Sequence, residues 1–409
     1  MLKFCRVLVI LFSAFLLCAN WGVHRSPPGG SSEAREDALA QLVYLEDQVH
    51  AGLGERLQAW FPEGNAFTHV LYGLAWCGYG HIASDPVDTQ HAIAEAEWAY
   101  RQLDSPGLKG LFPTVMEPKY GAFYSGWRNY LLGRIIELSG PMVSPRLVDE
   151  FDAQSAELRR AYSGSDSPFL PSYDGMAWPG DNVVAIASLA MHQRLRMDSD
   201  DVVIDRWLRQ ATERLDEDGS LPHAWDPIND RMVQAARGSS QSLMNCFLPV
   251  IDSAFATDQF VRYRERFLDS RLGVPMVREF AKGSVGTGDV DSGPIIFGAG
   301  SSATVVGPGA FRLNGDPVHA DELDASIEGF GMPVGGASKR YVFGLMPIAD
   351  LFIVWTRTMG ERVMTEPQRP SFMAFHLWSL LVAALLWLPM VFAGWKKRRA
   401  RDSQGAAAH

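Results

Sequence analysis

The chain has 409 residues, of which 47% are hydrophobic and 21% are charged, so it can bury a large core and lacks the composition of a disordered protein. Its formal net charge is −10, and because both ends are basic the middle of the chain is more acidic than that total. This acidity argues against nucleic acid as a partner, since nucleic-acid binding depends on neutralising phosphates.

Residues 1–24 have the pattern of a signal peptide or an uncleaved signal-anchor. Lys3 and Arg6 precede an apolar core of about 13 residues, the length typical of a secretory signal. No small-x-small cleavage site follows, so we favour the uncleaved anchor and keep the removed signal peptide as the alternative. Residues 25–34, rich in Pro, Gly and Ser, form a flexible linker.

Between residues 35 and 360 the apolar residues recur with a helical period, and almost no alternating pattern typical of strands is present. We predict about twelve helices separated by loops rich in Gly and Pro. They span residues 39–60, 66–79, 89–103, 122–139, 144–162, 182–197, 201–215, 231–254, 259–268, 298–313, 320–328 and 347–359.

Two adjacent predicted helices indicate how this all-α domain is arranged. Residues 182–197 are apolar on nearly every side, whereas residues 201–215 carry a charged face. Alternating buried and amphipathic helices fit six helical hairpins closed into an (α/α)6 toroid, with buried helices inside and amphipathic helices outside. An open helical solenoid is the alternative, but the sequence has no repeating period that would support it.

The C-terminal part predicts a membrane segment. After a linker over residues 361–371, the 24 residues from Phe372 to Trp395 carry no formal charge, which is enough to cross a hydrocarbon core of roughly 30 Å as a helix. Five Lys and Arg residues then follow within residues 396–409 and predict a cytoplasmic tail. The lipid bilayer is therefore a predicted partner, and the domain over residues 35–360 is predicted to be extracytoplasmic.

Four polar, aromatic stretches lie at or before buried helices, over residues 117–130, 172–182, 222–242 and 286–294. In a toroid such loops would meet at one rim and could form a pocket. The candidate proton-transfer residues are Glu117, Tyr173, Asp181, His223, Asp289 and Asp291. The candidate substrate-binding residues are Trp127, Arg128, Trp178, Asn182 and Trp225.

Several of these residues also have a structural interpretation. Asp181 precedes an unbroken helix and could be its N-cap, and His223 could simply bond to the backbone. Arg128 needs a carboxylate partner, which could be structural or could belong to a substrate. Asp289 and Asp291 resemble part of a calcium loop but lack its downstream Glu, and no CxxC pair suggests zinc, so we expect no metal and no cofactor. Cys77 and Cys246 are expected to be buried free thiols, with a disulfide between them as the alternative.

With these helical hairpins and the stretch Trp178-Pro-Gly-Asp-Asn182 in view, the chain resembles the six-hairpin (α/α)6 superfamily. That superfamily includes glycoside hydrolases, polysaccharide lyases, epimerases and linalool dehydratase-isomerase-like proteins. Pro179 to Asn182 is similar to the Pro-Asp-Asn helix start of the linalool dehydratase-isomerase group, in which flanking cysteines take part in catalysis. Here Trp178 stands before the motif and Ala187 lies within the helix, so the resemblance does not extend to that cysteine-dependent chemistry.

The combination of aromatic side chains and carboxylates favours a membrane-anchored enzyme that hydrolyses or eliminates a glycan, with two carboxylates as acid and base. A second hypothesis is a non-catalytic scaffold that binds a glycan or an envelope protein at the same rim. A third is a dehydratase or isomerase that acts on lipid-like alcohols close to the bilayer.

Overall fold

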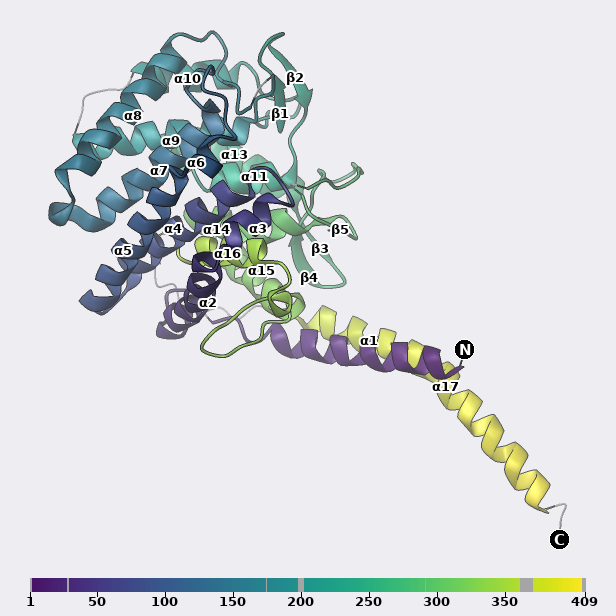
Figure 1. The fold of residues 1–409 in the computed structure, drawn as a ribbon. Helices are drawn as coiled ribbons and strands as arrows, with labels where there is room; N and C mark the ends of the chain where they lie inside the picture. Colours follow the sequence, from purple (N-terminus) through teal and green to yellow (C-terminus); the bar gives the residue numbers. More distant parts are fainter. Residues whose placement is uncertain are drawn as a thin grey trace.

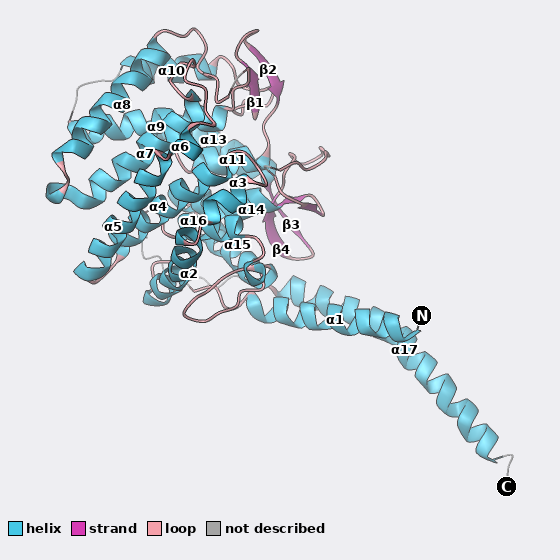
Figure 2. Cartoon of the chain, viewed as in Figure 1, coloured by secondary structure: helices cyan, strands magenta, loops and turns pink. Residues whose placement is uncertain are grey.

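The computed structural model describes residues 2–27, 29–173, 175–197, 202–290, 292–360 and 371–406. The fold is mainly helical, as Figures 1 and 2 show. The strands in this part of the chain form three two-stranded antiparallel pairs. The pairs are β1 (Ala224–Asp226) with β2 (Arg231–Gln234), β3 (Leu268–Arg271) with β4 (Val274–Val277), and β5 (Ile295–Ile296) with β6 (Ala299–Gly300).

Six helices in the described part of the chain, each largely buried, pack against one another. They are α4 (Gly64–Ile82), α7 (Gly121–Ser139), α9 (Pro179–Arg196), α11 (Gly238–Asn245), α14 (Ser301–Leu313) and α16 (Pro347–Arg357). Each packs on the next in this order, and α16 packs on α4. Small residues allow close approach, since a Cβ at Gly126 of α7 would lie 2.8 Å from Ala185 Cβ of α9.

The amphipathic helices cover these buried ones. They are α2 (Ser32–His50), α5 (Pro86–Leu103), α8 (Pro145–Ser163), α10 (Val202–Thr212), α13 (Ser253–Phe267) and α15 (Pro317–Phe330). Helix α2 packs on α4 and α16, α5 on α4 and α7, α8 on α7 and α9, and α15 on α14. The short helices are α3 (Leu53–Gln58), α6 (Pro106–Lys109) and α12 (Leu248–Ile251).

Two of the predicted helices each proved to be more than one element, and the helix predicted over residues 259–268 begins earlier, as α13, at Ser253. The helix predicted over residues 39–60 is two helices, α2 and α3, because Gly52 between them has a left-handed φ of 80°. The helix predicted over residues 231–254 begins as strand β2, which pairs with β1, and only then continues as α11 and α12. Cys77 and Cys246 are buried and free, as expected.

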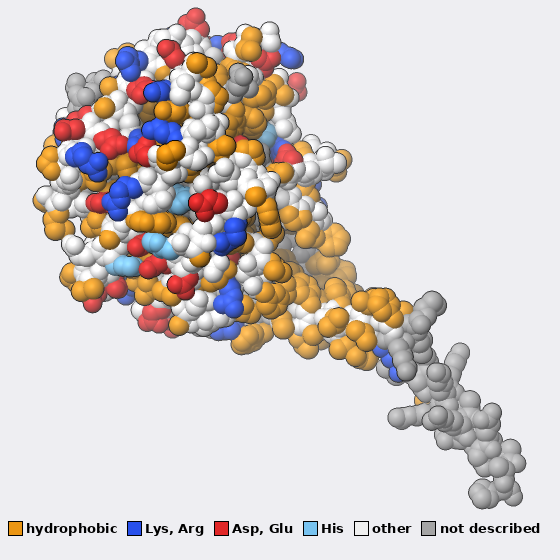
Figure 3. Space-filling view, in the orientation of Figure 1, with side chains coloured by type: hydrophobic (Ala, Val, Ile, Leu, Met, Phe, Trp, Pro, Cys, Tyr) orange, Lys and Arg blue, Asp and Glu red, His pale blue; other side chains and the backbone are white. Residues whose placement is uncertain are grey.

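The two terminal helices, α1 (Leu2–Gly22) and α17 (Met373–Ala406), lie together and project from the body (Figure 1). Their surface is largely hydrophobic where the side chains are described (Figure 3). Phe4–Gly22 and Met373–Met390 are long and apolar enough to cross a membrane. Trp387 Nε1 donates a hydrogen bond to Ser13 Oγ at 3.0 Å, which links the two helices. Residues 361–370 of the predicted second linker lie outside the described residues.

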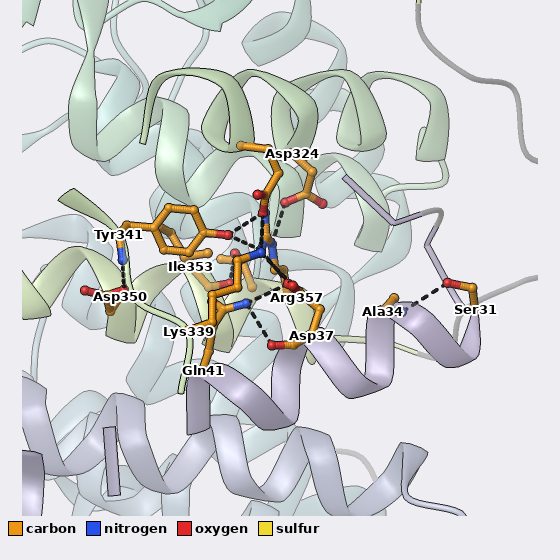
Figure 4. A network of polar contacts seen from close by, with 12 residues as sticks. Ser31, Ala34, Asp37, Gln41, Asp324, Lys339, Tyr341, Asp350, Ile353 and Arg357 are labelled. Atoms are coloured by element: carbon orange, nitrogen blue, oxygen red, sulfur yellow. Dashed lines mark hydrogen bonds and ion pairs between the residues drawn. The ribbon is translucent and has the colours of Figure 1, made fainter. Parts of the chain in front are cut away.

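A buried network of charges joins the first amphipathic helix to the last part of the body (Figure 4). At its centre, Arg357 Nε lies 3.0 Å from Asp324 Oδ1 and Arg357 Nη1 lies 3.1 Å from Asp37 Oδ2. The remaining members of the network are Arg312, Glu328, Lys339 and Tyr341. Asp37 of α2 is thereby held by Lys339 and by Arg357 of α16, which lie 302 and 320 residues away along the chain.

Candidate functional site

A pocket of about 280 Å³ lies where the N-terminal ends of the buried helices converge. All six of these helices, or the loops that lead into them, contribute to its lining. Most of the lining side chains are apolar or aromatic, and the carboxylates among them are Glu63 and Asp181. This arrangement is typical of a ligand site, in which an apolar surface carries a few converging polar groups.

Tyr173 and Trp178, which lie in the same loop before α9, form an aromatic wall of the pocket. Their rings meet edge to face, with centroids 5.3 Å apart, and Tyr173 also packs against Phe123 of α7. The loop is fixed from behind by Asn182, whose side-chain amide donates to the carbonyl oxygens of Leu170 and Trp178 at 3.0 Å. Asn182 is fully buried, so it holds the loop and does not line the pocket.

Asp181 lies in the pocket wall, 7% exposed, within the first turn of α9. The alternative of an N-cap was wrong, because α9 begins at Pro179 and Trp178 occupies the N-cap position without a side-chain bond. The Asp181 carboxylate accepts a hydrogen bond from Trp127 Nε1 at 3.4 Å. A carboxylate in the first turn is also stabilised by the helix dipole.

His223 lines the pocket from the loop before β1 and is 6% exposed. Its Nδ1 has no hydrogen-bond partner among the described residues, so the alternative of a ring bonded to the backbone is not realised at this atom. Burial and the nearby Arg237 together lower the pKa of His223 to about 4, although Asp289 opposes the shift. The imidazole is therefore neutral at pH 7 and can both donate and accept a hydrogen bond.

Asp289 does not line the pocket but lies beside it, next to the lining residue Val290. It forms a bidentate ion pair with the guanidinium of Arg237, which itself pairs with the buried Glu279 at 2.7 Å. Burial works against ionisation of Asp289, but the bonds from Arg237 and Ser292 hold its pKa at about 2. Asp289 is therefore ionised, and its oxygens are engaged by Arg237, so it supports the pocket wall. Asp291 lies outside the described residues.

The other predicted residues lie away from the pocket lining. Trp127 is buried behind Asp181, and Trp225 donates from Nε1 to Asp230 at 3.1 Å. Glu117 is exposed. The partners of Arg128 are structural, because its guanidinium lies 2.6 Å from Asp104 and 2.5 Å from Glu150 on the outer side of α7.

Glu63 is the lining carboxylate that the sequence analysis missed. It lies directly before α4, which begins at Gly64, and its side chain is half-buried and lines the pocket together with Phe61 and Phe67. The segment Pro62-Glu63-Gly64 before an apolar helix was the available signal, since polar loops before the other buried helices were considered for the same reason. Hydroxyl groups of Ser239, Ser240, Ser301 and Ser302 complete the polar part.

Glu63, Asp181 and His223 thus bring two carboxylates and one neutral imidazole to an otherwise apolar cavity. Such groups can donate and accept protons. Comparison of the chain with models of known protein families and with curated protein sequences found no match.

Proposed function

We propose that the body is an (α/α)6 toroid with the pocket at the mouth of its central axis. The order of helix contacts supports this, since it runs through α4, α7, α9, α11, α14 and α16 and returns to α4. The gathering of pocket residues at the N-terminal ends of the same helices is what a toroid would produce, whereas an open solenoid would spread them along one face.

We further propose that α1 and α17 anchor the body in a membrane, with the body extracytoplasmic and the tail cytoplasmic. Both helices pass the length and hydropathy criteria for a span, and the Lys and Arg residues after residue 395 favour this orientation. The body would then lie close to the bilayer, because the turn between β3 and β4 packs directly on the start of α17. A Cβ at Gly273 in this turn would lie only 2.6 Å from Phe375 N.

For the pocket, we propose acid–base catalysis on a lipid-like alcohol, by dehydration or by isomerisation of its double bonds. The observation that carries this proposal is the mainly apolar and aromatic lining around Glu63, Asp181 and His223. Such a lining favours a hydrocarbon chain with one hydroxyl group over a fully hydroxylated ligand, because buried hydroxyl groups without partners are costly.

In the proposed dehydration, Glu63 acts as the general acid that gives a proton to the substrate hydroxyl, and the carbon–oxygen bond breaks to release water. Asp181 takes a proton from the neighbouring carbon, and the electron pair of that carbon–hydrogen bond forms the double bond. Asp181 is assigned as the base because the helix N-terminus and the Trp127 N–H stabilise its ionised form. The neutral His223 holds the hydroxyl by a hydrogen bond.

The test is turnover of isoprenoid and straight-chain alcohols by the full chain in detergent, followed by mass spectrometry of the alkene product. We expect Glu63→Gln and Asp181→Asn each to lower turnover by roughly 100-fold or more, the usual size of a lost acid or base. Glu117→Gln is the matched control, an exposed carboxylate outside the pocket, and should leave turnover unchanged. Equal turnover in all three variants would reject the assignment.

A glycan-directed hydrolase or lyase is the second candidate, and the aromatic wall of Tyr173 and Trp178 favours it, because such rings can stack on sugar rings. In that case Glu63 and Asp181 would act as the carboxylate pair on a glycosidic bond. Cleavage of an oligosaccharide panel, with loss in the same two variants and no reaction of the alcohols, would support this candidate over the first. Binding of a glycan without cleavage, unaffected by either variant, would instead support a non-catalytic scaffold.

A further inference from the structure

Four side chains of the kinds that can bind metals, two glutamates and two histidines, meet between helices α2 and α5, apart from the pocket lining. Glu46 and His50 lie one helical turn apart on α2, and His91 and Glu95 lie one turn apart on α5. His91 Nε2 lies 3.0 Å from Glu46 Oε2, and His50 Nε2 lies 2.8 Å from Glu95 Oε2. The ligand atoms of Glu46, His91 and Glu95 all lie within 4.8 Å of one another.

We propose that these four residues bind one Zn²⁺ ion that links α2 to α5. Two imidazoles and two carboxylates form an ordinary zinc ligand set, and two carboxylates balance the charge of the ion. Ligand atoms of a tetrahedral zinc site are about 3.3 Å apart. The two pairs at 2.8 and 3.0 Å would open slightly on binding. The other ligand atoms, which lie up to 4.8 Å apart among Glu46, His91 and Glu95, would move closer together, and His50 would join them through a change of its side-chain rotamer. The imidazoles favour zinc over Ca²⁺ and Mg²⁺, which take oxygen ligands.

Neighbouring groups fix the orientation of the proposed ligands, as a metal site requires. Tyr72 of α4 donates a hydrogen bond to Glu95 Oε2 at 2.7 Å, which fixes the orientation of that carboxylate. The ring of Trp98 packs against His50 with centroids 3.9 Å apart, and Trp76 meets the ring of His91 edge to face. Both imidazoles consequently present Nε2 to the carboxylates.

The sequence analysis expected no metal because no CxxC pair suggests zinc and the stretch with Asp289 and Asp291 lacks the downstream Glu of a calcium loop. It did not consider this cluster, whose two halves are 45 residues apart along the chain. A pair of glutamate and histidine one turn apart on a single amphipathic helix is commonly a solvated face. In the structure, however, α2 and α5 place Glu46 opposite His91 and His50 opposite Glu95. The two pairs therefore form one cluster and not two separate solvated faces. None of the four residues lines the pocket, so the ion would stabilise the body without entering the proposed chemistry.

The experiment uses the full chain in detergent, purified without a histidine tag and stripped of metal by a chelator. Zinc is titrated in by calorimetry, Co²⁺ is used as a coloured substitute for Zn²⁺, and the melting temperature is recorded with and without zinc. We expect one Zn²⁺ per chain, the visible absorption of tetrahedral Co²⁺, and a higher melting temperature with zinc bound.

The double variant His50→Ala/His91→Ala should weaken zinc binding at least tenfold, and Glu46→Gln should weaken it as well. His81→Ala is the matched control, because His81 is a histidine of similar exposure, 3.8 Å from a carboxylate that two arginines already contact. It should bind zinc like the unmodified chain. The proposal is overturned if the full chain binds no stoichiometric zinc, or if the double variant and the control bind it equally. If the double variant does not fold, the Co²⁺ spectrum of the full chain and the Glu46→Gln titration decide the question.

Discussion

Asp350 lies in the first turn of α16, and its carboxyl group is fully buried. Its Oδ1 accepts a hydrogen bond from the Tyr341 backbone N–H at 2.7 Å, while Oδ2 has no partner among the described residues. Burial raises the pKa of Asp350 to about 7, although the Tyr341 N–H and the nearby Arg340 and Arg357 oppose the shift. The native protein therefore holds a proton on Asp350 at mildly acidic pH.

This raised pKa makes stability depend on pH. Between about pH 4 and pH 7 the native Asp350 is protonated while the unfolded one is not, so the free energy of unfolding falls as pH rises through this window. Asn at position 350 keeps the acceptor for Tyr341 and cannot ionise. We expect Asp350→Asn to flatten this part of the profile and to raise the free energy of unfolding at pH 8, by at most about 4 kcal/mol.

Denaturant unfolding of both proteins at a series of pH values between 4 and 8 measures this difference. Asp205→Asn, at an exposed position on α10, serves as the control and should follow the unmodified chain at every pH. Parallel profiles for Asp350→Asn and the unmodified chain would mean that Asp350 is ionised in the native state.

At the scale of elements, the start of α9 positions the aromatic wall of the pocket. The Asn182 side chain is bonded on both ends, since its Oδ1 accepts from the Leu170 N–H and the Tyr162 hydroxyl at 2.8 and 2.7 Å, and its amide donates to two carbonyls. The loop is also tied to β1, because Ala177 and Trp225 exchange backbone hydrogen bonds. Asn182 thus connects the first turn of a buried helix to the loop that carries Tyr173 and Trp178.

We expect Asn182→Ala to lower the free energy of unfolding by roughly 2–4 kcal/mol, because it leaves several buried polar groups without partners. Backbone amide hydrogen exchange over residues 170–178 should accelerate, since this loop loses its attachment to α9. Asn229→Ala removes an exposed asparagine and is the control, with an expected change within about 0.5 kcal/mol. Equal exchange rates in the two variants would show that the loop is held by its other contacts alone.

The sequence predicts the buried helices well where apolar residues surround the whole helix, as in α9. Such a helix has no polar face to turn toward water, so it must be buried on all sides. It predicts less well where a partner lies elsewhere in the chain. The position of Asp181 was ambiguous because Pro179 begins α9 three residues earlier than expected. Arg128 has its two carboxylates on separate segments, at Asp104 and Glu150, and no spacing in the sequence connects them.

At the scale of the whole molecule, the pocket depends on contacts between the two ends of the body. Helix α16 packs on both α2 and α4, which belong to the first hairpins. Lys339 reaches Asp37 at 2.6 Å and Glu328 at 2.7 Å, so one cation joins segments 302 residues apart. Hydrophobic periodicity describes each helix by itself and cannot distinguish a closed ring from an open array, which is why the proposed closure rests on these long-range contacts.

Arg357 is the residue that tests this closure, because its guanidinium contacts carboxylates from α2 and α15 at once. Asp37, Asp324 and Glu328 all lie within 3.1 Å of it, and the site is buried. Arg357→Met should lower the free energy of unfolding by about 3–5 kcal/mol, since the buried Asp324 and Glu328 and the half-buried Asp37 would share too few cations. Proteolysis under native conditions should also begin near α2, the helix that loses its attachment.

Arg101→Met is the matched control for that measurement, because Arg101 pairs with Glu97 one turn away on the exposed face of α5. Such a surface pair contributes at most about 1 kcal/mol, so the control should unfold close to the unmodified chain. A loss in Arg357→Met no larger than in Arg101→Met would mean that α2 is held by apolar packing against α4 and α16, and that the charge network adds little to closing the body.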